Sequence, residues 1–171
     1  MQWIESVCNK FSKYLGIFIA FLLIIMMINV AFDSLNRYLM NSNSVALQEM
    51  EWHLFSVIIL LGLSYTLNQE GHVRVDILYT NFSAKKKAII NMVGVITFVL
   101  PLSLLVAFGS LGFVAEAYNF MEQSGDPGGL HYRFIIKGLI PTAFFILIFM
   151  SIGYFARNYN LLKRLNSSSD S

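Results

Sequence analysis

Four charge-free segments dominate this sequence and restrict what it can fold into. Asp, Glu, Lys and Arg are all absent from residues 14–32, 52–69, 88–115 and 138–156, which are 19, 18, 28 and 19 residues long. The hydrocarbon core of a bilayer is about 30 Å thick, and a helix needs roughly 20 apolar residues to cross it. Backbone amides in lipid must be paired within their own segment, which favours helices over open strands. The sequence therefore predicts an all-α, polytopic membrane protein with four transmembrane helices.

The composition agrees with this class of protein. Hydrophobic residues make up 56% of the chain and charged residues 13%, whereas soluble domains carry about 25% charged residues. The 28-residue segment would exceed 40 Å as a helix, so we expect it to tilt or project, with Pro101 as a candidate kink. We expect a single four-helix domain over residues 1–171, with spans at about 14–39, 47–69, 86–119 and 133–157 and a flexible tail at 166–171.

The distribution of cations predicts the orientation of the four spans. An even number of spans puts both termini and the 70–87 connection on one side, which holds nine of the twelve Lys and Arg residues. The positive-inside rule then places both termini in the cytoplasm. Attraction to anionic headgroups, about 1 kcal/mol per cation, accounts for the run Lys85–Lys87 as an inner-face anchor.

The connection between helices two and three has a pattern of its own. Apolar Val73, Val75 and Ile77 alternate with polar residues, which predicts a short interfacial segment. Gly71 is the expected end of helix two, and Ser83 is the expected N-cap of helix three.

Charged residues also gather at the other, outer boundary. Two alternatives stay open for them: they pair within the chain, or they contact another subunit or a soluble partner. The turn-forming run before helix four consists of Asp126, Pro127, Gly128 and Gly129, because Pro restricts φ and Gly permits positive φ. The candidate outer-face contact residues are Asp33 and Arg37 on helix one, Glu49 and Glu51 on helix two, and Arg133 and Lys137 on helix four.

The middle of each span lacks ionisable groups, which argues against a transport path within this chain. We expect the hydroxyls of Ser56, Ser64, Thr97, Ser103 and Thr142 to serve helix packing. Three scattered histidines, His53, His72 and His131, form no metal or catalytic pattern. We therefore expect no enzyme activity, cofactor, metal or nucleic acid in this chain. The rival interpretations are a small tetraspan redox or enzyme subunit, with or without haem, and a homo-oligomeric channel.

Two sequence runs resemble a known family. The run LQEMEWHLFSVIILLGLSYTLNQEGHVRVDILY, residues 47–79, contains the G-H-x-R-V-D pattern as Gly71, His72, Arg74 and Asp76. The second run is GDPGGLHYRFIIKGLIP, residues 125–141. Together they resemble the small membrane (Q) subunit of TRAP transporters, the tripartite ATP-independent periplasmic family. Many members carry two adjacent acids and a nearby Arg where this chain has Gln48-Glu49 and Trp52.

The resemblance implies a non-catalytic scaffold in a sodium-coupled importer of an organic acid: a sialic acid, a C4-dicarboxylate or a 2-oxo acid. The implied partners are a large membrane (M) subunit that holds the sodium ions and the transport site, a periplasmic substrate-binding (P) protein, and the lipid bilayer. The implied location is the bacterial inner membrane. The outer charged residues then become candidate contacts for these proteins, and the family motif joins Lys85, Lys86 and Lys87 in inner-face anchoring.

Overall fold

A computed structural model describes residues 2–69 and 82–167, and every regular element in those two ranges is helical. Four helices are long and apolar enough to cross a membrane, which confirms the predicted fold class. The third of these is one continuous rod made of α4, a π-helical turn η1, and α5. The elements are α1 (Gln2–Met40), α2 (Val45–Asn68), α4 (Ala84–Gly94), η1 (Val95–Val99), α5 (Leu100–Asn119) and α6 (Arg133–Ser167).

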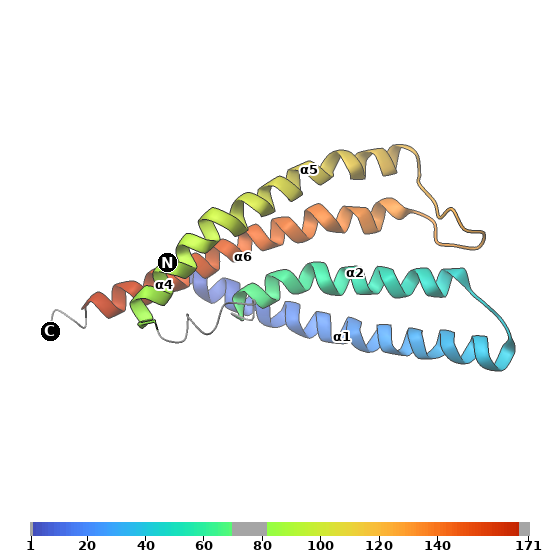
Figure 1. Ribbon diagram of the computed structural model, residues 1–171, viewed down its shortest axis with the longest axis horizontal. Coiled ribbons are helices and arrows are strands. Elements are labelled where there is room, and N and C mark those ends of the chain that lie inside the picture. The colour runs from blue at the N-terminus through green and yellow to red at the C-terminus, as the bar shows by residue number, and fades with distance from the viewer. Residues whose placement is uncertain (1, 70–81, 168–171) are drawn as a thin grey trace.

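The helices form two hairpins that pack side by side. Helix α1 pairs with α2, the α4–η1–α5 rod pairs with α6, and α2 and α6 join the two hairpins (Figure 1). Helix α1 also contacts α6. We call the end with connections 41–44 and 120–132 the hairpin end, and the end where α1 begins and α6 finishes the terminal end. The side of the membrane on which each end lies stays a prediction from the charge distribution.

The helices are longer than the spans expected from the sequence. Each expected span falls within one helix or rod, except that Gln69 is the C-cap of α2 rather than part of it. Helix α1 begins twelve residues before position 14, and α6 continues two residues into the segment predicted as a tail. Ser83 caps α4 as predicted, since its side chain accepts a bond from the Lys86 amide at 3.4 Å. Gly71 and the alternating segment 73–77 lie outside the described residues.

The long third rod contains one local irregularity, next to Pro101. Proline has no amide hydrogen and its ring crowds the carbonyl four residues earlier, so a regular α-helix is disturbed there. The chain responds with the π-helical turn η1, in which the Leu100 amide bonds the Val95 carbonyl five residues back. The rod of 36 residues is therefore continuous and about 54 Å long.

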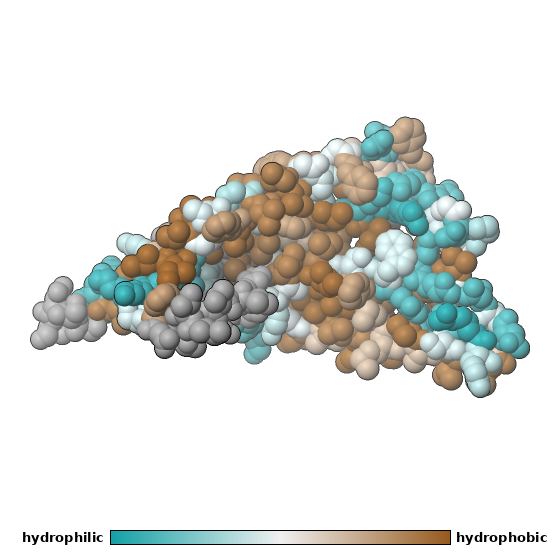
Figure 2. Space-filling view, viewed as in Figure 1, coloured by the Kyte–Doolittle hydropathy of each residue, from teal (hydrophilic) through white to brown (hydrophobic). Residues whose placement is uncertain are grey.

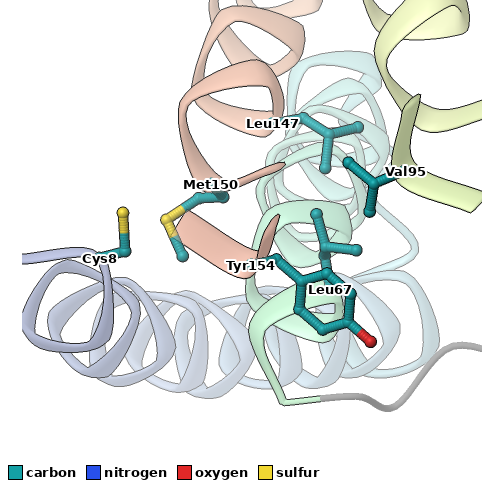
Figure 3. Close-up of a cluster of buried hydrophobic side chains, with 6 residues drawn as sticks. All are labelled: Cys8, Leu67, Val95, Leu147, Met150 and Tyr154. Atoms are coloured by element: carbon teal, nitrogen blue, oxygen red, sulfur yellow. The ribbon is translucent and has the colours of Figure 1, made fainter. Parts of the chain in front are cut away.

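A buried cluster holds the bundle together toward the terminal end. Figure 3 shows side chains from α1, α2, η1 and α6 meeting around Met150, which is completely buried. Two glycines let helices approach closely here: a β-carbon on Gly16 would lie 2.5 Å from the Tyr65 ring, and one on Gly153 would lie 2.6 Å from Cys8 Cβ. The members of the cluster are Cys8, Leu67, Val95, Leu147, Met150 and Tyr154.

The outer surface of the bundle is apolar along its middle and hydrophilic at the hairpin end (Figure 2). Large hydrophobic side chains are exposed on the helix faces that turn away from the core, such as Phe21 at 58% and Phe98 at 75%. Such a continuous apolar surface fits lipid or another membrane protein, not water.

Candidate functional site

Glu49 is the centre of a polar cluster at the hairpin end. It lies in the second turn of α2, is only 5% exposed, and receives three bonds from the second hairpin. Its Oε1 accepts from Ser124 Oγ at 2.5 Å and from Arg133 Nη2 at 3.0 Å, and its Oε2 accepts from the Leu130 amide at 2.5 Å. One carboxylate thus ties the start of α2 to both ends of the 120–132 connection, and we call this cluster the Glu49 clamp.

The connection that Glu49 grips is a compact loop. Its ends are tied by the Arg133 amide to the Glu122 carbonyl at 3.0 Å, and by the Ser124 amide to the Leu130 carbonyl at 3.1 Å. Its tip is the predicted turn, closed by a bond from the Gly129 amide to the Asp126 carbonyl at 3.0 Å. Pro127 at the second turn position and Gly128 at φ +82° in the third match a type II turn, which requires positive φ there.

Gly129 has a different role from Gly128. A β-carbon at this position would collide with the Ser124 side chain and lie 2.9 Å from Glu49 Oε2. The absence of a side chain therefore lets the loop backbone approach the carboxylate closely enough for the neighbouring Leu130 amide to bond it. The D-P-G-G run is thus the local sequence that builds the clamp's loop.

Two further ion pairs lie at the hairpin end. Lys137 pairs with Glu122, at the base of the loop. Arg37 Nη2 lies 2.7 Å from Asp33 Oδ2, with Asp33 fully buried, Arg37 47% exposed, and a geometry outside that of a hydrogen bond. Each pair lies inside a single hairpin: Asp33 and Arg37 in the first, and Glu122 and Lys137 in the second. In the described chain, only the Glu49 clamp joins α2 to the second hairpin through charged groups at this end.

The structure shows which of the outer charged residues pair within the chain. Pairing within the chain is confirmed for Glu49 with Arg133, and for Asp33 with Arg37. Lys137 also pairs within the chain, although with Glu122 and not with an acid on α2. Glu51 is half-buried, and its Oε1 has no hydrogen-bond partner among the described residues. Contact of these six side chains with another protein stays a prediction.

A second polar network, which no sequence pattern predicted, lies toward the terminal end. Asn68 Nδ2 donates to Asn9 Oδ1 at 3.2 Å, which joins α2 to α1. Arg157 Nη1 donates to the Asn68 carbonyl at 2.9 Å, and Asn91 Nδ2 donates to Asn158 Oδ1 at 3.0 Å. All four membrane helices are therefore joined by polar bonds here. Two of these asparagines, Asn68 and Asn91, lie inside charge-free runs, where an amide side chain is costly in lipid unless it is hydrogen-bonded. That placement was the sequence signal for the network.

The predicted inner-face residues are only partly described. Lys85, Lys86 and Lys87 form the first turn of α4, where Lys85 and Lys86 are exposed and Lys87 is half-buried. Gly71, His72, Arg74 and Asp76 lie outside the described residues. The anchoring role of this group stays a prediction.

Four of the five hydroxyls expected to serve helix packing bond carbonyls of their own helices. Ser56, Thr97, Ser103 and Thr142 each bond the carbonyl four residues earlier, at 2.6 to 2.8 Å. Ser64 Oγ is buried, with no bonding partner in the described part of the chain. Hydroxyls held in this way do not line a polar path, in agreement with a packing role. Within residues 2–69 and 82–167, no group of three His, Cys, Asp or Glu side chains is placed to hold a metal ion.

The four long apolar helices define a multi-pass membrane protein, and comparisons with known proteins show its family. Residues 22–161 match the family model described as "Tripartite ATP-independent periplasmic transporters, DctQ component". The chain therefore belongs to the DctQ family of TRAP transporter components. It is also 27% identical over 156 residues to the Haemophilus influenzae protein named "Putative TRAP transporter small permease protein", covering 86% of this chain and 92% of that protein. No solved structure matches the chain.

Proposed function

We propose that this chain is the non-catalytic scaffold subunit of a sodium-coupled TRAP transporter that imports an organic acid across the bacterial inner membrane. The observation that carries the proposal is the family match together with the placement of polar groups. Ionisable side chains occupy the ends of the helices, and the clamp residues bond one another. The hydroxyls of Ser56, Thr97, Ser103 and Thr142 bond their own helices, whereas those of Ser12 and Ser64 are buried with no partner in the described residues. A chain of this kind would support a partner subunit and would contain no transport path of its own.

The polar bonds make the bundle suitable as a fixed frame. The Glu49 clamp joins the two hairpins at the hairpin end, and the Asn68–Arg157 bond joins α2 to α6 toward the terminal end. Polar contacts at both ends oppose sliding of one hairpin past the other. The apolar faces outside this frame are where the large membrane (M) subunit would pack. That subunit would carry the sodium ions and the moving transport site.

The hairpin end is the proposed surface for the periplasmic substrate-binding (P) protein. Asp126, Pro127 and Gly128 form an exposed tip, and the Glu49 clamp holds this tip in place from below. Arg37 presents a second exposed charge on the same end. Glu49 itself is too buried to contact a second protein directly, so its contribution to docking would be to position the loop.

The identity of the organic acid would rest with the partners, because the proposal assigns the transport site to the large membrane (M) subunit. A sialic acid, a C4-dicarboxylate and a 2-oxo acid are the candidates. The distinguishing measurement is sodium-driven uptake of each acid by the reconstituted complex.

Affinity purification of the tagged chain from its native membrane tests the scaffold proposal. We expect a much larger polytopic membrane protein to co-purify in near-equal amount, and the pair to take up one of the three acids when a sodium gradient and a binding protein are supplied. A chain that purifies alone, or as a homo-oligomer that conducts ions, would contradict the proposal and favour the channel.

Docking is tested separately on the same reconstituted pair. Asp126→Lys reverses an exposed charge at the loop tip without touching the clamp. We expect it to raise the binding-protein concentration that gives half-maximal uptake and to leave the maximal rate unchanged. Glu116→Lys makes the same reversal at an exposed position on α5 outside the loop tip, so it is the matched control and should change neither quantity. Equal effects of the two variants would remove the loop tip from the docking surface.

A further inference from the structure

Two shallow cavities flank the place where α1 begins and α6 finishes. One has a volume of about 540 Å³ and is lined by α1 residues from Gln2 to Lys13 and by Arg164 of α6. The other has a volume of about 600 Å³ and lies between the first turn of α1 and the last turns of α6. Gln2 and Arg164 line both cavities, so the two cavities adjoin one another. We call the two cavities together the cationic groove.

Four of the five charged residues that line this region are cations. Lys10, Lys13 and Arg164 line the first cavity, and Lys163 joins Arg164 in the second. None of these four cations has an ion-pair partner among residues 2–69 and 82–167. Glu5 is the one acid in the lining, and its Oε2 already accepts a bond from Asn160 Nδ2 at 2.9 Å. The lining therefore carries a net positive charge, which an anion can neutralise.

Apolar and aromatic side chains border the cations. Trp3 and Tyr159 line the second cavity and are 77% and 46% exposed. Indole and phenol rings favour the boundary between lipid and water. Phe11 and Tyr14 are also exposed on α1, and they follow Lys10 and Lys13 directly in the sequence. A ligand that combines a negative head with an apolar tail fits this arrangement better than a small hydrophilic anion does.

The position of Lys13 sets the depth of the groove in the membrane. Lys13 directly precedes the charge-free run 14–32, so it marks the boundary of the hydrocarbon core. The groove starts at this level and leads away from the core along α1. Lipid headgroups occupy this layer, and basic grooves between membrane helices at this depth suit anionic headgroups.

We propose that this groove binds the headgroup of an anionic phospholipid, with phosphatidylglycerol as the simplest representative. The planar Arg164 guanidinium would grip the phosphate with two parallel bonds, and Lys10 and Lys13 would add point charges. The acyl chains would follow the exposed side chains of Phe11 and Tyr14. A bound lipid would stabilise the contact between α1 and α6, which also meet where Cys8 packs against Gly153. The site differs from the Lys85–Lys87 run, which lines neither cavity.

Native mass spectrometry of the full chain, purified and stripped of lipid in mild detergent, tests the proposal. Three probes are titrated separately: dioleoyl-phosphatidylglycerol, dioleoyl-phosphatidylcholine and glycerol 3-phosphate. The groove variant Lys10→Gln/Lys13→Gln/Arg164→Gln is compared with the control variant Lys85→Gln/Lys86→Gln/Lys87→Gln, which removes the same charge outside the groove. Glu5→Gln removes the one acid and provides a variant that should gain affinity.

We expect one phosphatidylglycerol to bind at least about tenfold more tightly than phosphatidylcholine. The groove variant should lose this preference, and Glu5→Gln should strengthen it. The control variant removes the weaker, general attraction of the Lys85–Lys87 run for anionic headgroups, so it should lower the binding of additional lipids and keep the tight binding of the first. Equal losses in the two triple variants would show diffuse surface charge and overturn the proposal. Equal binding of the two lipids would overturn it as well, and so would glycerol 3-phosphate binding as tightly as the lipid. Should the groove variant fail to fold, Arg164→Gln alone and the gain in Glu5→Gln decide the matter.

Discussion

Replacing Gly153 by alanine tests the tightest helix contact in the core. A β-carbon at position 153 would meet the Cys8 thiol and lie 2.6 Å from Cys8 Cβ. Carbon atoms in contact normally lie about 3.5 to 4.0 Å apart. Helices α1 and α6 must therefore separate by about 1 Å to admit one methyl group. Movement at this point also disturbs Met150 and Tyr154, which pack in the same buried cluster.

The expected cost follows from these distances. Forcing an extra carbon into a packed core costs about 1–3 kcal/mol. Alanine in place of glycine within a helix returns up to about 1 kcal/mol. Gly62→Ala and Gly109→Ala are matched controls, because nothing lies within 4 Å of a β-carbon at either position. Both controls gain the helix propensity of alanine and avoid the collision. Gly153→Ala should therefore be about 2 kcal/mol less stable than the controls.

Thermal unfolding in detergent measures this difference. For a chain of this size about 2–4 °C corresponds to 1 kcal/mol, so the midpoint of Gly153→Ala should lie roughly 4–8 °C below that of either control. Cys8 is the single cysteine and is 1% exposed. Its reaction with a maleimide dye should therefore become faster in Gly153→Ala and stay unchanged in the controls.

An exchange of side chains across the contact can refute the reasoning. Cys8→Gly/Gly153→Ala moves the β-carbon from one helix to the other, so the double variant should be less destabilised than the sum of its single changes. Cys8→Ala keeps the β-carbon 2.6 Å away and should not rescue Gly153→Ala to the same degree. Additive effects in the exchange, or a Gly153→Ala midpoint equal to the controls, would show that the helices do not meet at these residues.

Three further variants test the clamp, the polar network and the absence of a transport path. Glu49→Gln places an amide where only acceptors fit, so we expect the thermal midpoint and uptake at limiting binding protein to fall. Glu51→Gln removes no bond within the described chain and should leave the thermal midpoint unchanged. Asn68→Ala removes the bond to Asn9 and should cost about 0.5–1.5 kcal/mol in thermal unfolding; no change in the midpoint would remove this bond from the frame. Ser103→Ala should leave uptake by the complex unchanged, because this hydroxyl bonds its own helix, and a large loss of uptake would contradict the scaffold proposal.

The fold class was readable from the sequence because lipid leaves few choices. Runs free of charge and near 20 residues long cross a bilayer only as helices, so the number of long helices followed from local composition. Local chemistry also predicted the Ser83 cap and the Asp126–Gly129 turn, since caps and turns depend on neighbouring residues alone. Helix ends were less predictable, and α1 begins well before its charge-free run because Lys10 and Lys13 are good helix formers in water as well.

The tertiary structure decided how the polar groups pair. The sequence placed acids on α2 and bases on α6 at one end of the bundle, and both intrachain pairs and contacts with another protein satisfied that pattern. Glu49 finds Ser124, Leu130 and Arg133 across 75 to 84 residues of sequence because the two hairpins pack along α2 and α6.

The asparagine network depends on packing in the same way. Asn68 and Asn9 meet only because α1 and α2 lie antiparallel in one register. Hydrophobicity along the chain reports how each segment meets lipid, and it is nearly the same for every rotation of a helix about its axis. The sequence alone therefore determined that four helices cross the membrane and which family they belong to. The rotation and register of those helices, and with them the Glu49 clamp and the cationic groove, came from the close approach of side chains in three dimensions.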